Sequence, residues 1–167
     1  IGLNKGGKNI TLEPGNQIEL SGEKLNHIHD ACAESQDYLF ELKQVTKKLN
    51  IKIVSAGFDP ISTLNEIPNN PKKRYELMTK DMPLGGELSL DMMYRTCGTQ
   101  LNIDYKSEKD FTKKFKIVNS IVPISIALFA NSSIVEKKNS NYLSYRSKVW
   151  QNTSRGGLPK LFLENMD

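Results

Sequence analysis

The chain has 167 residues, 38% of them hydrophobic and 25% charged, which is the balance of a soluble globular protein large enough to bury a core. Its net charge of +4 suits an anionic ligand such as a nucleotide. The lysines are scattered, however, and no basic stripe is interleaved with aromatic residues, so the pattern does not favour binding to nucleic acid.

The scarcity of cysteine and histidine excludes two further classes of protein. Two cysteines, Cys32 and Cys97, are too few for a disulfide-rich scaffold, and we expect both to be free thiols. With only two histidines there is no ligand set for zinc. We expect a cytoplasmic location. Because the chain begins without Met, we interpret it as an interior fragment that is incomplete at both ends.

The segment Thr11–Gly22 is polar along one side if it forms an extended strand. Successive side chains of a strand point to opposite faces, so Glu13, Gln17 and Glu19 share one face. Two carboxylates without a basic residue between them indicate a cation or phosphate site, with a solvated outer face as the alternative. The pair Pro14-Gly15 is a turn signal that can shift this phase.

The next elements are predicted from apolar spacing. Apolar residues three and four apart predict a long amphipathic helix over Glu23–Leu49. The residues Ile51–Phe58 predict a short buried strand, and Lys72–Lys80 a short helix that begins after a proline.

A second strand with a polar face is predicted over Leu88–Tyr105. Gln100, Asn102 and Asp104 alternate with apolar residues and so share one face. Small neighbours leave room there for a ligand, and an open solvated face is again the alternative.

A helix is predicted after Ser107, which has capping-box spacing to Asp110. Pro123 should kink or split this helix. The apolar run Ile117–Ala130 is short for a membrane span, which needs roughly 20 residues, and is typical of a buried core helix.

Oxygen-bearing side chains on two strand faces suit a hard cation such as Mg²⁺ together with substrate phosphates. Arg74 and Arg146 stand alone among apolar or aromatic residues, where a guanidinium can bind a carboxylate with two parallel hydrogen bonds. This combination indicates ATP-dependent activation of a carboxylate. The chain has no Walker-type phosphate loop.

Six sequence blocks resemble one family, the glutamate–cysteine ligases of the plant and proteobacterial type. The blocks occur in the family's order along nearly the whole chain, and family members are considerably longer. They are LEPGNQIELSG (12–22), GFDP (57–60), KKRYELM (72–78), LDMMYRTCGTQLNIDY (90–105), ALFANS (127–132) and YLSYRSKVW (142–150).

The resemblance implies an α+β fold like that of glutamine synthetase, with a curved, mainly antiparallel sheet and helices packed behind it. Residues 1–167 would be part of a single catalytic domain. The implied reaction joins glutamate to cysteine. ATP phosphorylates the γ-carboxylate of glutamate, and the amine of cysteine attacks the acyl phosphate, which gives γ-glutamylcysteine, the first product of glutathione synthesis.

The resemblance also implies roles for individual residues. Glu13 and Glu19 would bind Mg²⁺, with Gln100 completing a metal or phosphate contact and Asn102 beside it at the cofactor. Arg74 and Arg146 would hold glutamate and carry the catalytic role. Tyr145 and Trp150 would line the substrate site. Cys32 stands where plant members place one half of a regulatory disulfide.

The sequence departs from the family pattern at a few positions. Lys73 replaces a usual glycine, Lys148 replaces a usual histidine, and the segment around Arg155 is shorter. A further acidic strand of the family is missing, so we expect the 167 residues alone to be inactive. Another γ-glutamyl ligase, or a non-catalytic interaction domain with this fold, are the alternatives. We expect small-molecule substrates, without nucleic acid or membrane as partners.

Overall fold

The computed structural model describes residues 2–153. It is an α+β structure with a three-stranded sheet, a two-stranded sheet and five α-helices in that range. In chain order the elements are β1 (Gly2–Lys5), β2 (Lys8–Leu12), β3 (Ile18–Ser21), α1 (Ile28–Lys48), η1 (Leu64–Glu66), α2 (Lys73–Asp81), η2 (Met82–Gly85), α3 (Ser89–Arg95), α4 (Glu108–Leu128), β4 (Ile134–Val135), β5 (Lys138–Asn139) and α5 (Tyr145–Gln151).

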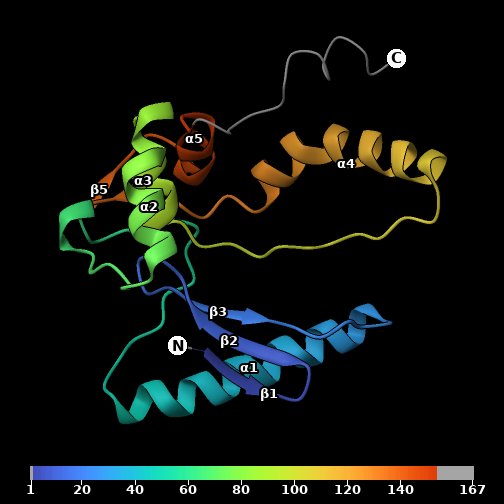
Figure 1. The fold of residues 1–167 in the computed structure, drawn as a ribbon, viewed down its shortest axis with the longest axis horizontal. Coiled ribbons are helices and arrows are strands. Elements are labelled where there is room, and N and C mark those ends of the chain that lie inside the picture. Colours follow the sequence, from blue (N-terminus) through green and yellow to red (C-terminus); the bar gives the residue numbers. More distant parts are fainter. Residues whose placement is uncertain (1, 154–167) are drawn as a thin grey trace.

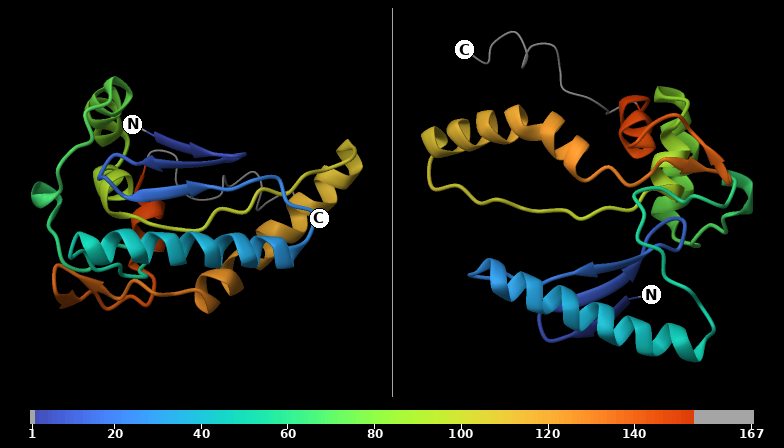
Figure 2. Two further views of the ribbon diagram at one scale, coloured as in Figure 1. Left: turned by 90° about the horizontal axis from the view of Figure 1, so that it is seen from below. Right: turned by 180° about the vertical axis from the view of Figure 1, so that it is seen from behind.

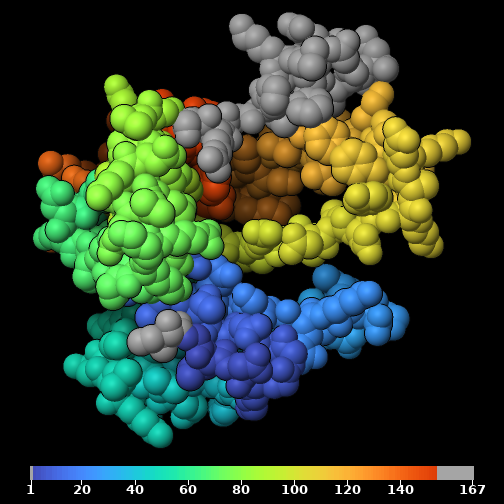
Figure 3. Space-filling model, viewed as in Figure 1, coloured from blue at the N-terminus to red at the C-terminus, as the bar shows by residue number. Residues whose placement is uncertain are grey.

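The elements form two groups that meet at a narrow junction (Figure 1). Strands β1–β3 and helix α1 form the first group, and α2, α3, α5 and the β4–β5 hairpin form the second. Helix α4 and the extended residues 97–106 make an arm that projects from the second group, and Figure 3 shows this arm standing away from the sheet. The sequence also predicts ordered structure over Leu158–Phe162, which lies outside the described residues.

The three-stranded sheet is antiparallel, with β2 in the centre. Its register aligns Leu3 with Ile10 and Ile10 with Leu20, so these side chains share one face. That face is turned toward α1, which lies across it in both views of Figure 2. The structure thus has an antiparallel sheet with a helix behind it, as the sequence predicts for this part.

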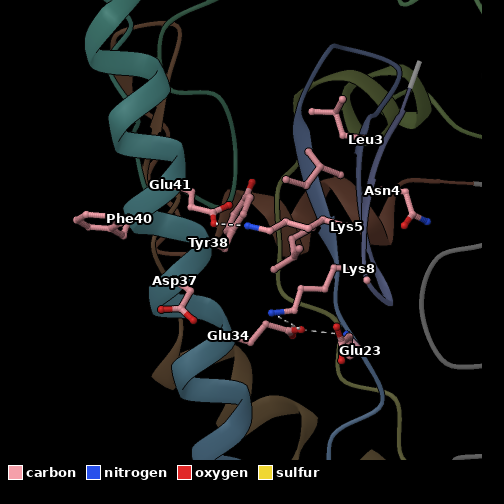
Figure 4. A pocket seen from close by; sticks show the side chains of 13 residues that line it. Leu3, Asn4, Lys5, Lys8, Glu23, Glu34, Asp37, Tyr38, Phe40 and Glu41 are labelled. Carbon is pink, nitrogen blue, oxygen red and sulfur yellow. Dashed lines mark hydrogen bonds and ion pairs between the residues drawn. The ribbon is translucent and has the colours of Figure 1, made fainter.

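A cavity separates this apolar face from α1 (Figure 4). Ion pairs cross its rim, between Lys5 and Glu41 at 3.0 Å and between Lys8 and Glu34 at 3.6 Å. None of the eight site residues named from the sequence lines it. We therefore read this cavity as the space between two elements and look for the functional site elsewhere.

The single strand predicted over Thr11–Gly22 is interrupted by a turn. Strand β2 ends at Leu12, and Glu13 N–H donates to the Gln17 carbonyl at 2.9 Å, which closes the loop. Asn16 has a φ of 63°, in the left-handed region that asparagine tolerates. The prediction that Glu13 and Gln17 share a strand face with Glu19 is therefore wrong, because the Pro14-Gly15 turn breaks the alternation.

Helix α1 begins later than predicted, at Ile28 rather than Glu23. His27 N–H donates to the Asp30 carboxylate at 3.3 Å and so marks the helix start. Asn50, with a φ of 54°, confirms the predicted stop. No described residue of α1 is buried, so Cys32 is exposed rather than part of a core stripe.

The small core of the second group explains why α3 replaces a predicted strand. Helix α2 is confirmed within one residue of its predicted bounds and buries Tyr75. Tyr75 packs with Met93 and Tyr94 of α3. Leu90 packs against the same cluster, and its spacing to Met93 and Tyr94 is that of one helix face, so residues 89–95 coil instead of extending. The prediction of a strand over Leu88–Tyr105 is wrong for this part, and residues 97–105 are extended without a sheet partner among the described residues.

The strand predicted over Ile51–Phe58 is also not formed. Only Phe58 makes a bridge, to Thr96, and Ile51 and Val54 are exposed. A buried strand requires neighbours on both sides, and the described residues provide none for this segment.

Helix α4 has the predicted start but not the predicted surroundings. The Ser107 hydroxyl accepts from Asp110 N–H at 3.2 Å, which confirms the cap. Pro123 lies inside the helix without splitting it. No described residue of α4 is buried, and Ile124 and Leu128 are exposed, so the prediction of a core helix is wrong here. Among the described residues no helix has the length and apolarity to cross a membrane.

Candidate functional site

The first turn of α5 presents a half-buried arginine, Arg146. Its Nε donates to the Cys97 carbonyl at 2.9 Å, and its guanidinium lies 5.6 Å from the centre of the Trp150 ring. Its backbone N–H donates to the Ser132 hydroxyl at 3.1 Å. Burial lowers the pKa of Arg146 from its ordinary value, although an arginine stays charged at any physiological pH.

No carboxylate of the described residues forms an ion pair with Arg146. The ion pairs formed by lysine and arginine within residues 2–153 do not include Arg146. A partly desolvated guanidinium without an acidic partner is a favourable position for an anionic ligand, because a carboxylate can take two parallel hydrogen bonds from it. Arg146 therefore has the properties of a carboxylate-binding residue.

Two glycines allow the backbone to approach Arg146 closely. A Cβ atom added at Gly98 would lie 2.8 Å from the Arg146 Nη2. One added at Gly57 would lie 3.3 Å from the Arg146 Cδ and 2.8 Å from the Asn131 Oδ1. Both distances below 3.0 Å are too short for real Cβ contacts, so an alanine at Gly98 would require the Arg146 guanidinium to move, and one at Gly57 would require the Asn131 side chain to move.

Three of the predicted substrate residues lie together on α5. Tyr145 and Trp150 are on the same helix as Arg146. The Tyr145 ring packs edge-on against the buried Phe58 ring, with 5.1 Å between centroids. Tyr145 thus anchors the helix to the loop that contains Phe58, whereas Trp150 is exposed and is accessible beside the guanidinium.

Arg74 does not join this group in the structure. It lies exposed on α2, where its guanidinium is 5.8 Å from the centre of the Tyr75 ring. No interaction between Arg74 and Arg146 is found in residues 2–153. The expected pair of arginines around one glutamate is therefore not assembled in this structure. Arg155, whose role the sequence left open, lies outside the described residues.

The predicted metal ligands are also separated. Glu19 lies on the sheet face opposite α1, where Thr11 is its neighbour in register and the Ser21 hydroxyl donates to its carboxylate at 3.4 Å. Glu13 lies in the turn before β3. Among the described residues there is no group of three acidic, histidine or cysteine side chains that would hold a metal ion. These residues alone do not fit a complete Mg²⁺ site.

Gln100 and Asn102 lie on the extended segment that leads to α4. The Gln100 Nε2 donates to the Asn102 Oδ1 at 3.0 Å, so the two side chains lie on the same side, as the predicted alternation requires. Both are exposed, and within the described range residues 98–104 form no backbone–backbone hydrogen bonds. The segment is extended like a strand but is not part of a sheet.

Comparison with known proteins gives the family. The model of the family described as glutamate-cysteine ligase family 2 (GCS2) matches residues 2–167. The chain belongs to the GCS2 glutamate–cysteine ligase family. It is 46% identical over 165 residues to a chloroplastic glutamate–cysteine ligase of Nicotiana tabacum, covering 97% of this chain and 32% of that protein.

Other members of the GCS2 family give the same result. Glutamate–cysteine ligase A of Oryza sativa subsp. japonica is 45% identical, with 97% of this chain and 34% of that protein covered. The chloroplastic glutamate–cysteine ligase of Arabidopsis thaliana is 44% identical, and the match covers 97% of this chain and 32% of that protein. The chain therefore spans about a third of the length of the curated relatives it matches.

The names of these relatives correct one expectation. All three are named chloroplastic proteins. The prediction of a cytoplasmic location is wrong by this comparison, because the relatives point to a plastid instead. Composition alone cannot separate the two compartments, since both hold soluble proteins with few disulfides.

The sequence did not indicate the tertiary contacts of two residues of this GCS2 chain, Gln17 and Arg95. The Gln17 Nε2 donates to the carbonyls of Met93 and Thr96, at 3.4 and 3.3 Å, and so ties the β2–β3 turn to the end of α3. Arg95 is buried between α3 and the β4–β5 hairpin. Both act through tertiary contacts, and no local spacing in the sequence indicates such a contact.

The two cysteines are free, as predicted, and both are exposed. The Cys97 pKa is raised, mainly because the atoms packed around the thiol desolvate it and also because Asp59 is near. The charge of Arg146 lowers the pKa of Cys97, but this effect is smaller than the desolvation of the thiol by the atoms around it. The Cys97 thiol therefore stays protonated at neutral pH and is a poor nucleophile.

Proposed function

We propose that this chain is part of the catalytic domain of an ATP- and Mg²⁺-dependent ligase that joins glutamate to cysteine. In the reaction, ATP transfers its terminal phosphoryl group to the γ-carboxylate of glutamate, and ADP leaves. The amine of cysteine then attacks the acyl carbon. The amide bond forms, phosphate leaves, and the amine gives up a proton. The product is γ-glutamylcysteine.

One observation carries this proposal, the half-buried guanidinium of Arg146 that has no acidic partner in residues 2–153. The Arg146 Nε donates to the Cys97 carbonyl, and no described residue is hydrogen-bonded to the two terminal nitrogens of the guanidinium. These nitrogens are therefore the donors that we assign to a carboxylate of glutamate. Trp150 would pack beside the bound substrate, and Arg74 stays a prediction as a second contact.

Positioning is what Arg146 would contribute to the reaction. A glutamate held by two parallel hydrogen bonds is fixed in rotation as well as in distance, so its γ-carboxylate meets the phosphoryl group in a constant direction. The proposal needs Arg146 to be charged, and the lowered pKa of an arginine still leaves it charged under assay conditions.

A larger curved sheet like that of glutamine synthetase is part of the proposal. The polar face of β1–β3 carries Glu19, and the extended segment carries Gln100 and Asn102 on one side. The backbone groups of residues 98–103 have no hydrogen-bond partner among the described residues, which favours pairing with a further strand. We propose that this segment joins a larger sheet in the complete ligase, which would bring these side chains toward ATP.

Magnesium requires more ligands than the described residues provide. Glu19, and Glu13 if the turn brings it near, would supply carboxylate oxygens, which Mg²⁺ prefers together with phosphate oxygens. Because the described residues do not fit the ion by themselves, we assign it no step in the reaction.

The test is the variant Arg146→Lys in the complete ligase. Lysine keeps the charge but cannot form two parallel hydrogen bonds. Hydrogen bonds to charged groups contribute about 1.5–3 kcal/mol, so we expect the KM for glutamate to rise roughly tenfold to hundredfold. The KM for ATP should change little.

The control is Lys138→Met, which removes an exposed positive charge from the neighbouring hairpin. It should leave both KM values close to those of the unmodified enzyme. Equal increases of both KM values in Arg146→Lys would show that the residue supports the structure rather than binding glutamate.

A further inference from the structure

Arg95 is a buried charge that stability alone does not explain. Its side chain is 3% exposed, and one nitrogen, Nη1, donates to the Asp91 carboxylate at 2.8 Å and to the Glu136 carboxylate at 3.2 Å. Among the described residues Nε and Nη2 have no hydrogen-bond partner. A buried ion pair of this kind is often no more stabilising than apolar residues of the same volume.

The position of Arg95 explains why a charged residue is buried here, because three separate segments meet at its side chain. Asp91 comes from the same helix, α3, and Glu136 from the turn between β4 and β5. The guanidinium also lies over the Phe58 ring, at 4.5 Å from the ring centre, which is within the range of a cation–π interaction. Arg95 thus joins α3, the hairpin and the loop around Phe58.

The contact with Phe58 and the backbone that follows Arg95 both lead to Arg146. The Phe58 ring packs on Tyr145, the residue directly before Arg146. The backbone after Arg95 carries Cys97, whose carbonyl accepts from the Arg146 Nε, and Cys97 N–H donates to the Gly57 carbonyl at 3.1 Å. The Arg95 carbonyl itself accepts from Asp59 N–H at 2.8 Å. The two chain segments that flank the Arg146 side chain are therefore both fixed by Arg95.

We infer that Arg95 is the positioning residue of the Arg146 carboxylate site, an inference that rests on the proposed function of Arg146. Arg95 acts through Phe58 and through the 95–98 backbone, and does not touch the substrate. The guanidinium suits this position, because it lies over the Phe58 ring while its Nη1 donates to two carboxylates. A lysine ammonium is a compact point charge and does not supply the planar group over the ring.

The experiment is a double-mutant cycle in the complete ligase with Arg95→Lys and Arg146→Lys. Arg95→Lys should raise the KM for glutamate about tenfold while the KM for ATP changes less than twofold, within the range of couplings between residues linked through a backbone shift. In the double variant the glutamate KM should be close to that of Arg146→Lys alone, because Arg95 acts only through Arg146.

Two further variants keep the test decisive if Arg95→Lys does not fold. Glu136→Gln removes one surface partner of Arg95 and should raise the glutamate KM in the same direction, by a smaller factor. Lys5→Met breaks an exposed ion pair of the first group, with Glu41 on α1, and should leave the glutamate KM unchanged.

The outcomes separate the two proposals. If Arg146→Lys alone leaves the glutamate KM unchanged, the proposed function fails. If Arg146→Lys raises it but the effects of the two substitutions multiply in the double variant, only the inference about Arg95 fails. Equal increases of both KM values in Arg95→Lys would likewise overturn it, because a general loss of structure does not distinguish the substrates.

Discussion

Gln17 and Arg146 donate hydrogen bonds to consecutive backbone carbonyls, Gln17 to Thr96 at 3.3 Å and Arg146 to Cys97 at 2.9 Å. One residue comes from the turn of the sheet and the other from α5, so the short segment 96–97 connects the two groups of elements. These two hydrogen bonds hold the start of the extended segment against both groups.

Gln17→Glu should destabilise the protein, because a carboxylate cannot donate to the Met93 and Thr96 carbonyls. We expect a loss of about 1–3 kcal/mol in the free energy of unfolding, measured with a chemical denaturant. Gln36→Glu, the same change at an exposed position of α1, should cost less than about 0.5 kcal/mol. Equal losses in both variants would show that Gln17 has no special structural role.

Gly98→Ala should displace the Arg146 guanidinium, since the new Cβ would lie 2.8 Å from Nη2. We expect the KM for glutamate to rise about tenfold in the complete ligase, because misplaced binding groups lose orientation. Gly7→Ala is the control, because its Cβ would meet only the flexible side chain of Glu23. An unchanged glutamate KM in Gly98→Ala would contradict the assignment of Arg146.

Glu19→Gln should remove most of the activity, and the remaining activity should require more Mg²⁺. The amide keeps the size of the carboxylate but loses the charge that attracts the ion. Steady-state rates over a range of Mg²⁺ concentrations measure this, with Glu108→Gln on the exposed first turn of α4 as the control. Turnover close to that of the unmodified enzyme at low Mg²⁺ would exclude Glu19 as a ligand.

Asp59 should make stability depend on pH in the acid range. Burial raises its pKa, but hydrogen bonds from the Ser62 and Ile61 backbone and the charge of Arg95 outweigh burial, so the pKa is lowered overall. A lowered pKa contributes stability that is present above the ordinary value and is lost as the pH falls through the folded value.

Asp59→Asn tests this sign. Asparagine cannot titrate, so the unmodified protein should have the higher melting temperature at about pH 7, and the difference should shrink at about pH 3. Thermal unfolding followed by circular dichroism at both pH values measures the difference. A difference that stays constant would mean that the Asp59 charge does not contribute to stability.

The elements that the sequence predicts well are those with complete local signals. Helix α2 follows a proline, and α4 has the Ser107 cap, so both bounds come from neighbouring residues. The alternation in β3 likewise places Glu19 on the polar face. These features need no knowledge of distant contacts.

The errors arise where a distant contact decides the structure. Residues 89–95 precede the alternating residues around Gln100 and are predicted as part of the same strand, yet Met93 and Tyr94 coil to reach Tyr75 of α2. Ile51–Phe58 has the composition of a buried strand but no neighbouring strand among the described residues. Arg95 stands in an apolar run, and only its partners in space, Asp91 and Glu136, give it a role.

The central claim, that the complete ligase joins glutamate to cysteine, is tested most directly by measuring γ-glutamylcysteine and ADP together. With ATP, Mg²⁺, glutamate and cysteine, we expect both products in equal amounts, with release of ADP depending on both amino acids. The 167-residue chain alone should form neither, because its described residues hold an incomplete set of metal ligands. ADP release without γ-glutamylcysteine, or equal rates with an amine other than cysteine, would contradict the account.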